Sequence, residues 1–248
     1  LFAGSDCRDE FSRFIRERIE CTLPERLLVG SAGHVPLAQA IAADLGRLVD
    51  EQDALTQRTQ SLLDQRWNER GDAHWAERFA MIKDGQRARV LVVTTRYSTY
   101  MHHSAQDLVE AYEGLGHDAE LLLEPDQHSG MTALLCLRKI DEYDPDLIVV
   151  VNYPRAVHQE LFPQGWAHVC WVQDAMGHLF QSSSYTPTRF DFLAGHVYEN
   201  AQAFAGYSED AVLAFPVPVA ETKFHNNALS VSDAERFACD IAYVSHQS

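Results

Sequence analysis

The sequence predicts an α/β protein with a Rossmann-like, doubly wound and mostly parallel sheet, preceded by a helical segment that contains one long helix. Two continuous apolar runs, 88–95 (ARVLVVTT) and 147–151 (LIVVV), are typical of strands that are buried on both faces. Helical patterns alternate with these strands, which favours a parallel sheet covered by helices. With 248 residues and 46% hydrophobic side chains, the chain can bury a substantial core.

Residues 1–85 are expected to be a mostly helical N-terminal segment. Apolar side chains recur at helical spacing over 11–19, before Pro24 stops the pattern. Between Leu37 and Arg66 a heptad-like seam steps by three or four residues, over roughly 45 Å of helix. Gly71 ends this run, and the pattern over 75–82 predicts a further short helix. The long helix either packs on its own domain or forms a coiled coil, which would make the protein a homo-oligomer through residues 37–66.

The segment 86–218 is expected to form the sheet domain. After the first strand, apolar residues on one face predict a helix over 104–115, and Gly116 is its stop signal. The remaining elements are read as strand 119–124, helix 131–143, and strands 147–151, 168–172, 190–194 and 211–215.

The segment 219–248 is expected to be a linker followed by the first strand of another domain. Residues 216–234 begin with two prolines and show no clear periodicity, as in a linker. Residues 239–244 (CDIAYV) have the composition of a buried strand. Because no helix follows to cover it, we interpret this strand as the start of a truncated or missing α/β domain. The chain also begins at Leu1 rather than Met, as an internal fragment would.

The charge of the chain argues against polyanionic partners. Its formal net charge is −16, and most of the excess acid lies in residues 86–248. Nucleic acids and anionic membrane surfaces both require positive charge on the protein, so neither is expected as a partner. No apolar run is long enough for a membrane span. The five cysteines are scattered without a Cys-x-x-Cys pair, which predicts a reduced, cytoplasmic protein without a zinc site.

Two polar segments are the candidate functional site, because ligands of open α/β sheets bind at the carboxyl ends of strands where the strand order reverses. With the order 3-2-1-4-5, that crevice lies between the first strand and the fourth. Two polar loops are expected to leave those strands, 96–103 (RYSTYMHH) and 173–178 (QDAMGH). Histidine and carboxylate groups that converge there can act as a general base on a hydroxyl group. The expected catalytic residues are His102, His103 and Asp174, and the expected substrate-binding residues are Arg96, Tyr97, Tyr100, Gln173 and His178.

Each of these residues also has a structural interpretation. His102 and His103 can lie in a water-exposed loop that caps a helix, and Asp174 can cap a short helix that starts near residue 175. His178 can be an ordinary surface residue. Arg96 has the charge to hold an anionic part of a substrate.

No cofactor or metal is expected. The segment 30–33 (GSAG) has the outline of a phosphate-binding turn, but the chain lacks both the Gly-x-Gly-x-x-Gly fingerprint and a Gly-Lys-Ser/Thr motif. The turn after the first strand is too bulky for a close approach to a pyrophosphate, and no His-x-x-x-His spacing occurs.

Several motifs together resemble the N-terminal half of bacterial GT-B glycosyltransferases, particularly the group similar to spore-maturation-protein glycosyltransferases. They are RVLVVTTRYSTY, GLGHDAELL, YDPDLIVVVN, HVCWVQD, AFPVPVAETKFH and the closing CDIAYVSHQS. The resemblance covers roughly residues 87–248. The resemblance implies a two-domain enzyme that transfers a sugar from a nucleotide-sugar donor to a sugar, glycan or protein acceptor. In that family the N-terminal domain contacts mainly the acceptor, so this chain is expected to be inactive alone.

Two alternatives remain open at this point. The first is a non-catalytic binding or scaffold module that assembles through its long helix. The second is a nucleotide-sugar epimerase, which shares the GT-B architecture.

Overall fold

The computed structural model describes residues 35–96, 98–124, 126, 129–174, 177–180, 186–196, 206–221, 223 and 230–239. The chain divides into two units, Leu1–Val217 and Pro218–Ser248, and each is described by itself. The helix expected over 11–19, the turn 30–33 and residues 240–244 of the last expected strand lie outside the described residues. Cys239 itself is exposed and belongs to no helix or strand.

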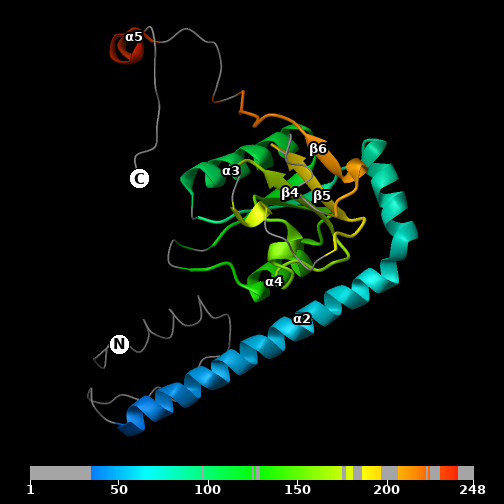
Figure 1. Cartoon of the computed structure of the whole chain (residues 1–248), viewed down its shortest axis with the longest axis vertical. Helices are drawn as coiled ribbons and strands as arrows, with labels where there is room; N and C mark the ends of the chain where they lie inside the picture. Colours follow the sequence, from blue (N-terminus) through cyan, green and yellow to red (C-terminus); the bar gives the residue numbers. More distant parts are fainter. Residues whose placement is uncertain are drawn as a thin grey trace. The chain divides into compact units, whose positions relative to one another are not determined.

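A parallel sheet forms the centre of the first unit (Figure 1). Its strands are β1 (Arg89–Val93), β2 (Asp118–Leu122), β3 (Leu147–Val151), β4 (Ala167–Val172), β5 (Asp191–Gly195) and β6 (Val212–Ala214). Every neighbouring pair is parallel, and the order is β2-β1-β3-β4-β5-β6. The predicted Rossmann-like α/β fold is therefore confirmed.

The strand order corrects the expected 3-2-1-4-5. Helix α3 (Thr99–Gly114) packs on one face of the sheet with Val90 and Val92, whereas α4 (Ala133–Tyr143) packs on the other face with Leu91 and Val93. Parallel crossovers are right-handed, so helices on opposite faces carry the chain in opposite directions. The chain consequently passes back over β1 and places β3 on its other side. The order thus reverses between β1 and β3, not between β1 and β4.

Helix α3 begins five residues earlier than its pattern predicted. Ser98 is its extended N-cap residue, with φ −124°, and the helix runs on from Thr99. Met101 is buried with Ala105 against the sheet, so the apolar face already includes the first turn. His102 and His103 are therefore helical residues, and the expectation that they belong to a loop was wrong.

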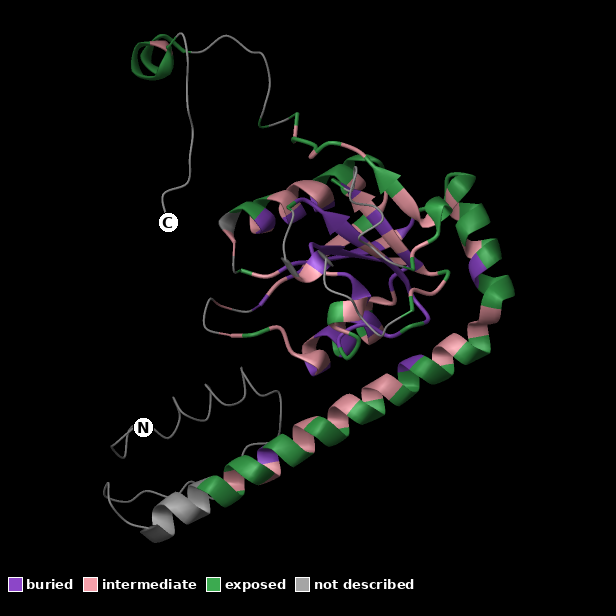
Figure 2. Ribbon diagram, in the orientation of Figure 1, coloured by how far each residue is buried: buried purple, intermediate pink, exposed green. Residues whose placement is uncertain are grey.

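Helix α2 (Val35–Lys83) is the long helix that the seam predicted, and it is interrupted at Gly71 as expected. Gly71 has φ 60° and ψ −175°, a conformation that is essentially restricted to glycine. Leu63 before the kink and Trp75 after it are buried in the core between the sheet and α4. Figure 2 shows that the rest of α2, from residue 42 onward, is mostly exposed or half-buried.

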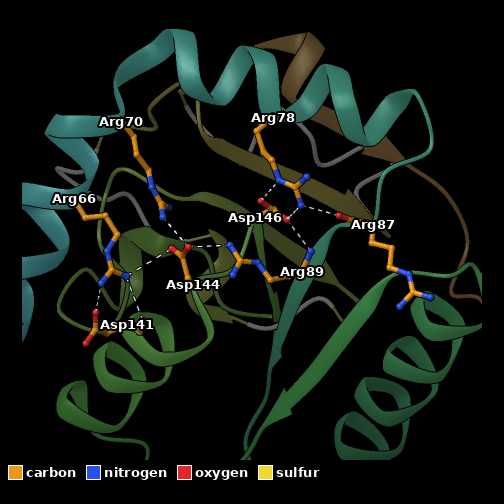
Figure 3. Close-up of polar contacts among 8 residues, drawn as sticks. All are labelled: Arg66, Arg70, Arg78, Arg87, Arg89, Asp141, Asp144 and Asp146. Atoms are coloured by element: carbon orange, nitrogen blue, oxygen red, sulfur yellow. Dashed lines mark hydrogen bonds and ion pairs between the residues drawn. The ribbon is translucent and has the colours of Figure 1, made fainter.

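Ion pairs attach α2 to the amino ends of the strands (Figure 3). Arg78 donates from Nε and Nη2 to the two oxygens of Asp146, at 2.8 and 2.7 Å. Arg70 pairs with Asp144 at 2.7 Å, and Arg89 at the start of β1 pairs with the same carboxylate at 2.8 Å. Burial alone would raise the pKa of Asp144, but Arg70 and Arg89 hold the pKa below its ordinary value.

The second unit contains one described helix, α5 (Val231–Phe237), whose first turn overlaps the expected linker. The Ser230 hydroxyl accepts a hydrogen bond from the Asp233 backbone N–H at 3.1 Å, and this cap lets a short polar stretch form a helix. None of the described helices combines the length and apolar character that crossing a membrane requires.

Candidate functional site

The candidate site is the carboxyl edge of the sheet, where polar side chains follow four neighbouring strands. Each of these side chains is almost completely buried, which is uncommon for polar residues that end a strand. They are Glu124 (6% exposed) after β2, Thr94 (2%) after β1, Asn152 (0%) after β3 and Gln173 (4%) after β4. Because the strands are parallel, these residues meet at one edge, and the reversal between β1 and β3 lies in the middle of their row.

Asn152 connects the ends of β3 and β4. Its side-chain Oδ1 accepts hydrogen bonds from the backbone N–H groups of Gln173, at 2.7 Å, and Asp174, at 3.3 Å. Its own backbone N–H donates to the Trp171 carbonyl at 2.9 Å. The residue has φ 61°, a left-handed conformation that asparagine tolerates better than most side chains do. One residue therefore fixes the start of the segment that follows β4.

His178 lies on a short 3₁₀ helix, η3 (Gly177–Phe180), and also contacts Asn152. Its Nε2 is 2.6 Å from the Asn152 backbone oxygen. The imidazole stacks on the Tyr153 ring, with centroids 4.5 Å apart and planes inclined by 7°. His178 is half-buried and held at two points, so it is not an ordinary surface residue.

The two predicted histidines of α3, His102 and His103, share no hydrogen bond with the residues around Asn152 in the described part of the chain. His102 and His103 stack on each other at 5.5 Å in the first turns of α3, and His103 is exposed. Within the described residues neither forms a hydrogen bond with Asp174 or His178. The structure therefore brings Gln173, Asp174 and His178 together through Asn152, but it does not join the histidine pair to them. Tyr100 is 50% exposed, and Tyr97 lies outside the described residues.

Arg96 is held at the end of β2. Its backbone N–H donates to Glu124 Oε2 at 2.7 Å, and its side-chain Nε donates to the Glu124 backbone oxygen at 2.7 Å. These bonds orient an exposed guanidinium group beside the row of buried polar residues.

Several buried polar atoms near this edge have no hydrogen-bond partner among the described residues. They are the hydroxyls of Thr94 and Thr95, both amide atoms of Gln173, and the Trp171 indole N–H. A buried polar group without a partner costs about 1–3 kcal/mol, so it often marks a place where a ligand or water completes the bonding. These groups are neutral donors and acceptors, which match hydroxyl groups better than phosphates.

Sequence reasoning missed Asn152, Tyr153, Thr94 and Glu124. The sequence does contain one indication of Asn152, which directly follows the apolar run LIVVV. The first polar residue after a buried parallel strand lies at the edge of the sheet where ligands bind.

The described residues contain no group of three or more His, Cys, Asp or Glu side chains arranged to hold a metal ion. Comparisons with protein-family models, curated proteins and solved structures find no match to this chain.

Proposed function

We propose that this chain is the acceptor-side half of a glycosyltransferase, which moves a sugar from a nucleotide-sugar donor to a hydroxyl group of an acceptor. The observation that supports this most directly is the set of buried neutral polar groups without a partner at the carboxyl edge, above all the amide of Gln173. A sugar hydroxyl both donates and accepts hydrogen bonds, as an amide does. The motif HVCWVQD, which contributes to the resemblance to GT-B enzymes, contains this amide directly before its last residue, Asp174.

The charged groups at the edge have complementary roles in this proposal. Asp174 is exposed, and its backbone is held by Asn152, so its carboxylate can orient an acceptor hydroxyl. Arg96, which is hydrogen-bonded to Glu124, carries a positive charge that would hold an anionic part of the substrate. The donor nucleotide would be held mainly by groups outside this chain.

Substitution of Gln173 by leucine tests the proposal, because it separates binding from folding. Removing a buried amide that has no partner should leave the stability of the protein unchanged or raise it. Loss of one or two hydrogen bonds to the acceptor should lower kcat/KM about tenfold or more. The assay is release of nucleoside diphosphate by the full-length protein from UDP- and GDP-sugars, with monosaccharide and glycan acceptors.

The matched control is Gln164→Leu, at an exposed glutamine before the amino end of β4. It should leave transfer unchanged. Full activity of Gln173→Leu would show that the carboxyl edge does not bind the acceptor. Conversion of the donor into an epimeric sugar, without transfer, would favour an epimerase instead.

A scaffold function rests on a different observation, the exposed apolar side chains of α2. Leu45, Val49 and Leu62 are 44%, 55% and 56% exposed. Burying the exposed half of such a side chain against a second copy would stabilise a dimer by about 1 kcal/mol. Sedimentation equilibrium should then show a dimer that the double substitution Leu45→Ser and Leu62→Ser dissociates, and a monomer at all concentrations would exclude this assembly.

A further inference from the structure

The hydrogen bond between His178 and Asn152 determines which nitrogen of the imidazole carries the proton. The Nε2 atom lies 2.6 Å from a backbone carbonyl oxygen, and that oxygen can only accept. The proton must therefore be on Nε2, because two lone pairs at this distance would repel each other. A neutral imidazole protonated at Nε2 has its free lone pair on Nδ1.

We propose that His178 is the proton acceptor of this site and acts through Nδ1. This inference rests on the proposed function and assigns the base to a residue that the sequence had suggested only for binding. Nδ1 has no hydrogen-bond partner among the described residues, and the ring is only partly buried, so a ligand hydroxyl can approach it. A base must have such an available lone pair within hydrogen-bonding reach of its substrate.

The position of the imidazole is fixed from two strands at once. Tyr153, directly after the Asn152 anchor, covers one ring face at 4.5 Å and sets the plane of the imidazole. The Asn152 side chain holds the backbone of Asp174 and Gln173, from which the chain continues to η3. By contrast, the described ring contact of His103 is with His102 alone, and the ring is exposed. Fixed orientation is what distinguishes a base from a surface histidine.

In the proposed step one proton is transferred, one carbon–oxygen bond forms and another breaks. The acceptor hydroxyl gives its proton to His178 Nδ1, and an oxygen lone pair forms the new bond to the anomeric carbon of the nucleotide sugar. The bond from that carbon to the diphosphate oxygen breaks, and its electron pair leaves with the nucleoside diphosphate. The imidazolium that results keeps its Nε2–H bond to the Asn152 carbonyl, and this bond strengthens because its donor is now charged.

The substitution His178→Gln separates anchoring from proton transfer. A glutamine side chain can place an amide N–H where Nε2 lies, so it can keep the bond to Asn152, but it offers no basic lone pair in place of Nδ1. The expected result is a native melting temperature with a loss of at least about 100-fold in kcat. His74→Gln, at an exposed position on α2, is the control and should keep full activity.

The tautomer is measured independently of activity, by ¹⁵N-edited NMR of the histidine rings with His178→Gln used to assign the signal. The expected state is Nε2–H, and an Nδ1–H or averaged tautomer would overturn the inference. Retained activity in His178→Gln, together with loss of activity in Gln173→Leu, would also overturn it while leaving the proposed function intact. If the parent transfers no sugar from any donor, the proposed function fails and the inference fails with it.

Discussion

Acidification should destabilise this protein through one buried histidine, His168 on β4. The side chain is completely buried and packs edge-on against Phe162, with ring centroids 5.2 Å apart. Neither ring nitrogen has a hydrogen-bond partner among the described residues. Burial and the nearby positive charge of Arg155 lower the pKa of His168 from 6.5 to about 3, although the carboxylate of Asp191 partly offsets this shift. The folded protein therefore keeps this imidazole neutral at pH values where the unfolded chain protonates it.

The size of the effect follows from these two pKa values. Because the pKa is lower in the folded state, the contribution to stability is complete above pH 6.5 and declines as the pH falls toward 3. Each pH unit in that window costs about 1.4 kcal/mol. Between pH 7 and pH 5 the free energy of unfolding should thus fall by about 2 kcal/mol because of His168 alone.

The assay is urea denaturation of the parent and of His168→Leu at pH 7, 6 and 5. All other titrating groups are common to both proteins, so the difference between their pH profiles isolates His168. The variant should lose about 2 kcal/mol less than the parent over this range. His168→Gln, which is also uncharged, should behave in the same way if leucine disturbs packing, and the exposed His74→Gln should follow the parent. Parallel profiles for the parent and both His168 variants would refute the reasoning.

Two further predictions concern packing and thiol chemistry. Gly165→Ala should lower the free energy of unfolding by about 1–3 kcal/mol in urea denaturation, because a β-carbon there would overlap the ring of Trp67. Gly46→Ala, in an open part of α2, is the control and should not destabilise the protein. Equal effects of the two substitutions would contradict the described packing at Gly165. Burial raises the pKa of Cys136 to about 12, whereas Cys239 is exposed. In the native protein, iodoacetamide should therefore modify Cys239 well before Cys136, as measured by mass spectrometry. Equal labelling rates would contradict the described burial.

The sequence predicted the elements of the sheet well because burial on both faces leaves a strong local signal. Strands β1 and β3 are the two continuous apolar runs, and both lie within one or two residues of their expected bounds. The order of the strands is not local information. It depends on which face each connecting helix covers, and the amphipathic pattern of α4 shows that it packs on a sheet but not on which side.

The candidate site was predicted in part for a similar reason. Gln173 and Asp174 follow a recognisable strand, so their place at the carboxyl edge could be inferred. Asn152 acts through its side-chain oxygen, its left-handed conformation and its backbone carbonyl, and the sequence alone does not show which groups these contact. The prediction of a loop at His102 and His103 is wrong because polar and aromatic residues interrupt the apolar pattern in the first turn of α3.

The attachment of α2 by Arg70 and Arg78 has a practical consequence for engineering this protein. Those ion pairs lie at the amino ends of the strands, whereas the candidate site lies at their carboxyl ends. Thermostability could therefore be improved at one end, by replacing or extending the arginine–aspartate pairs, without altering ligand selectivity at the other. Conversely, mutant libraries that vary the segments after β1, β3 and β4 would leave the ion pairs of Arg70 and Arg78 unchanged.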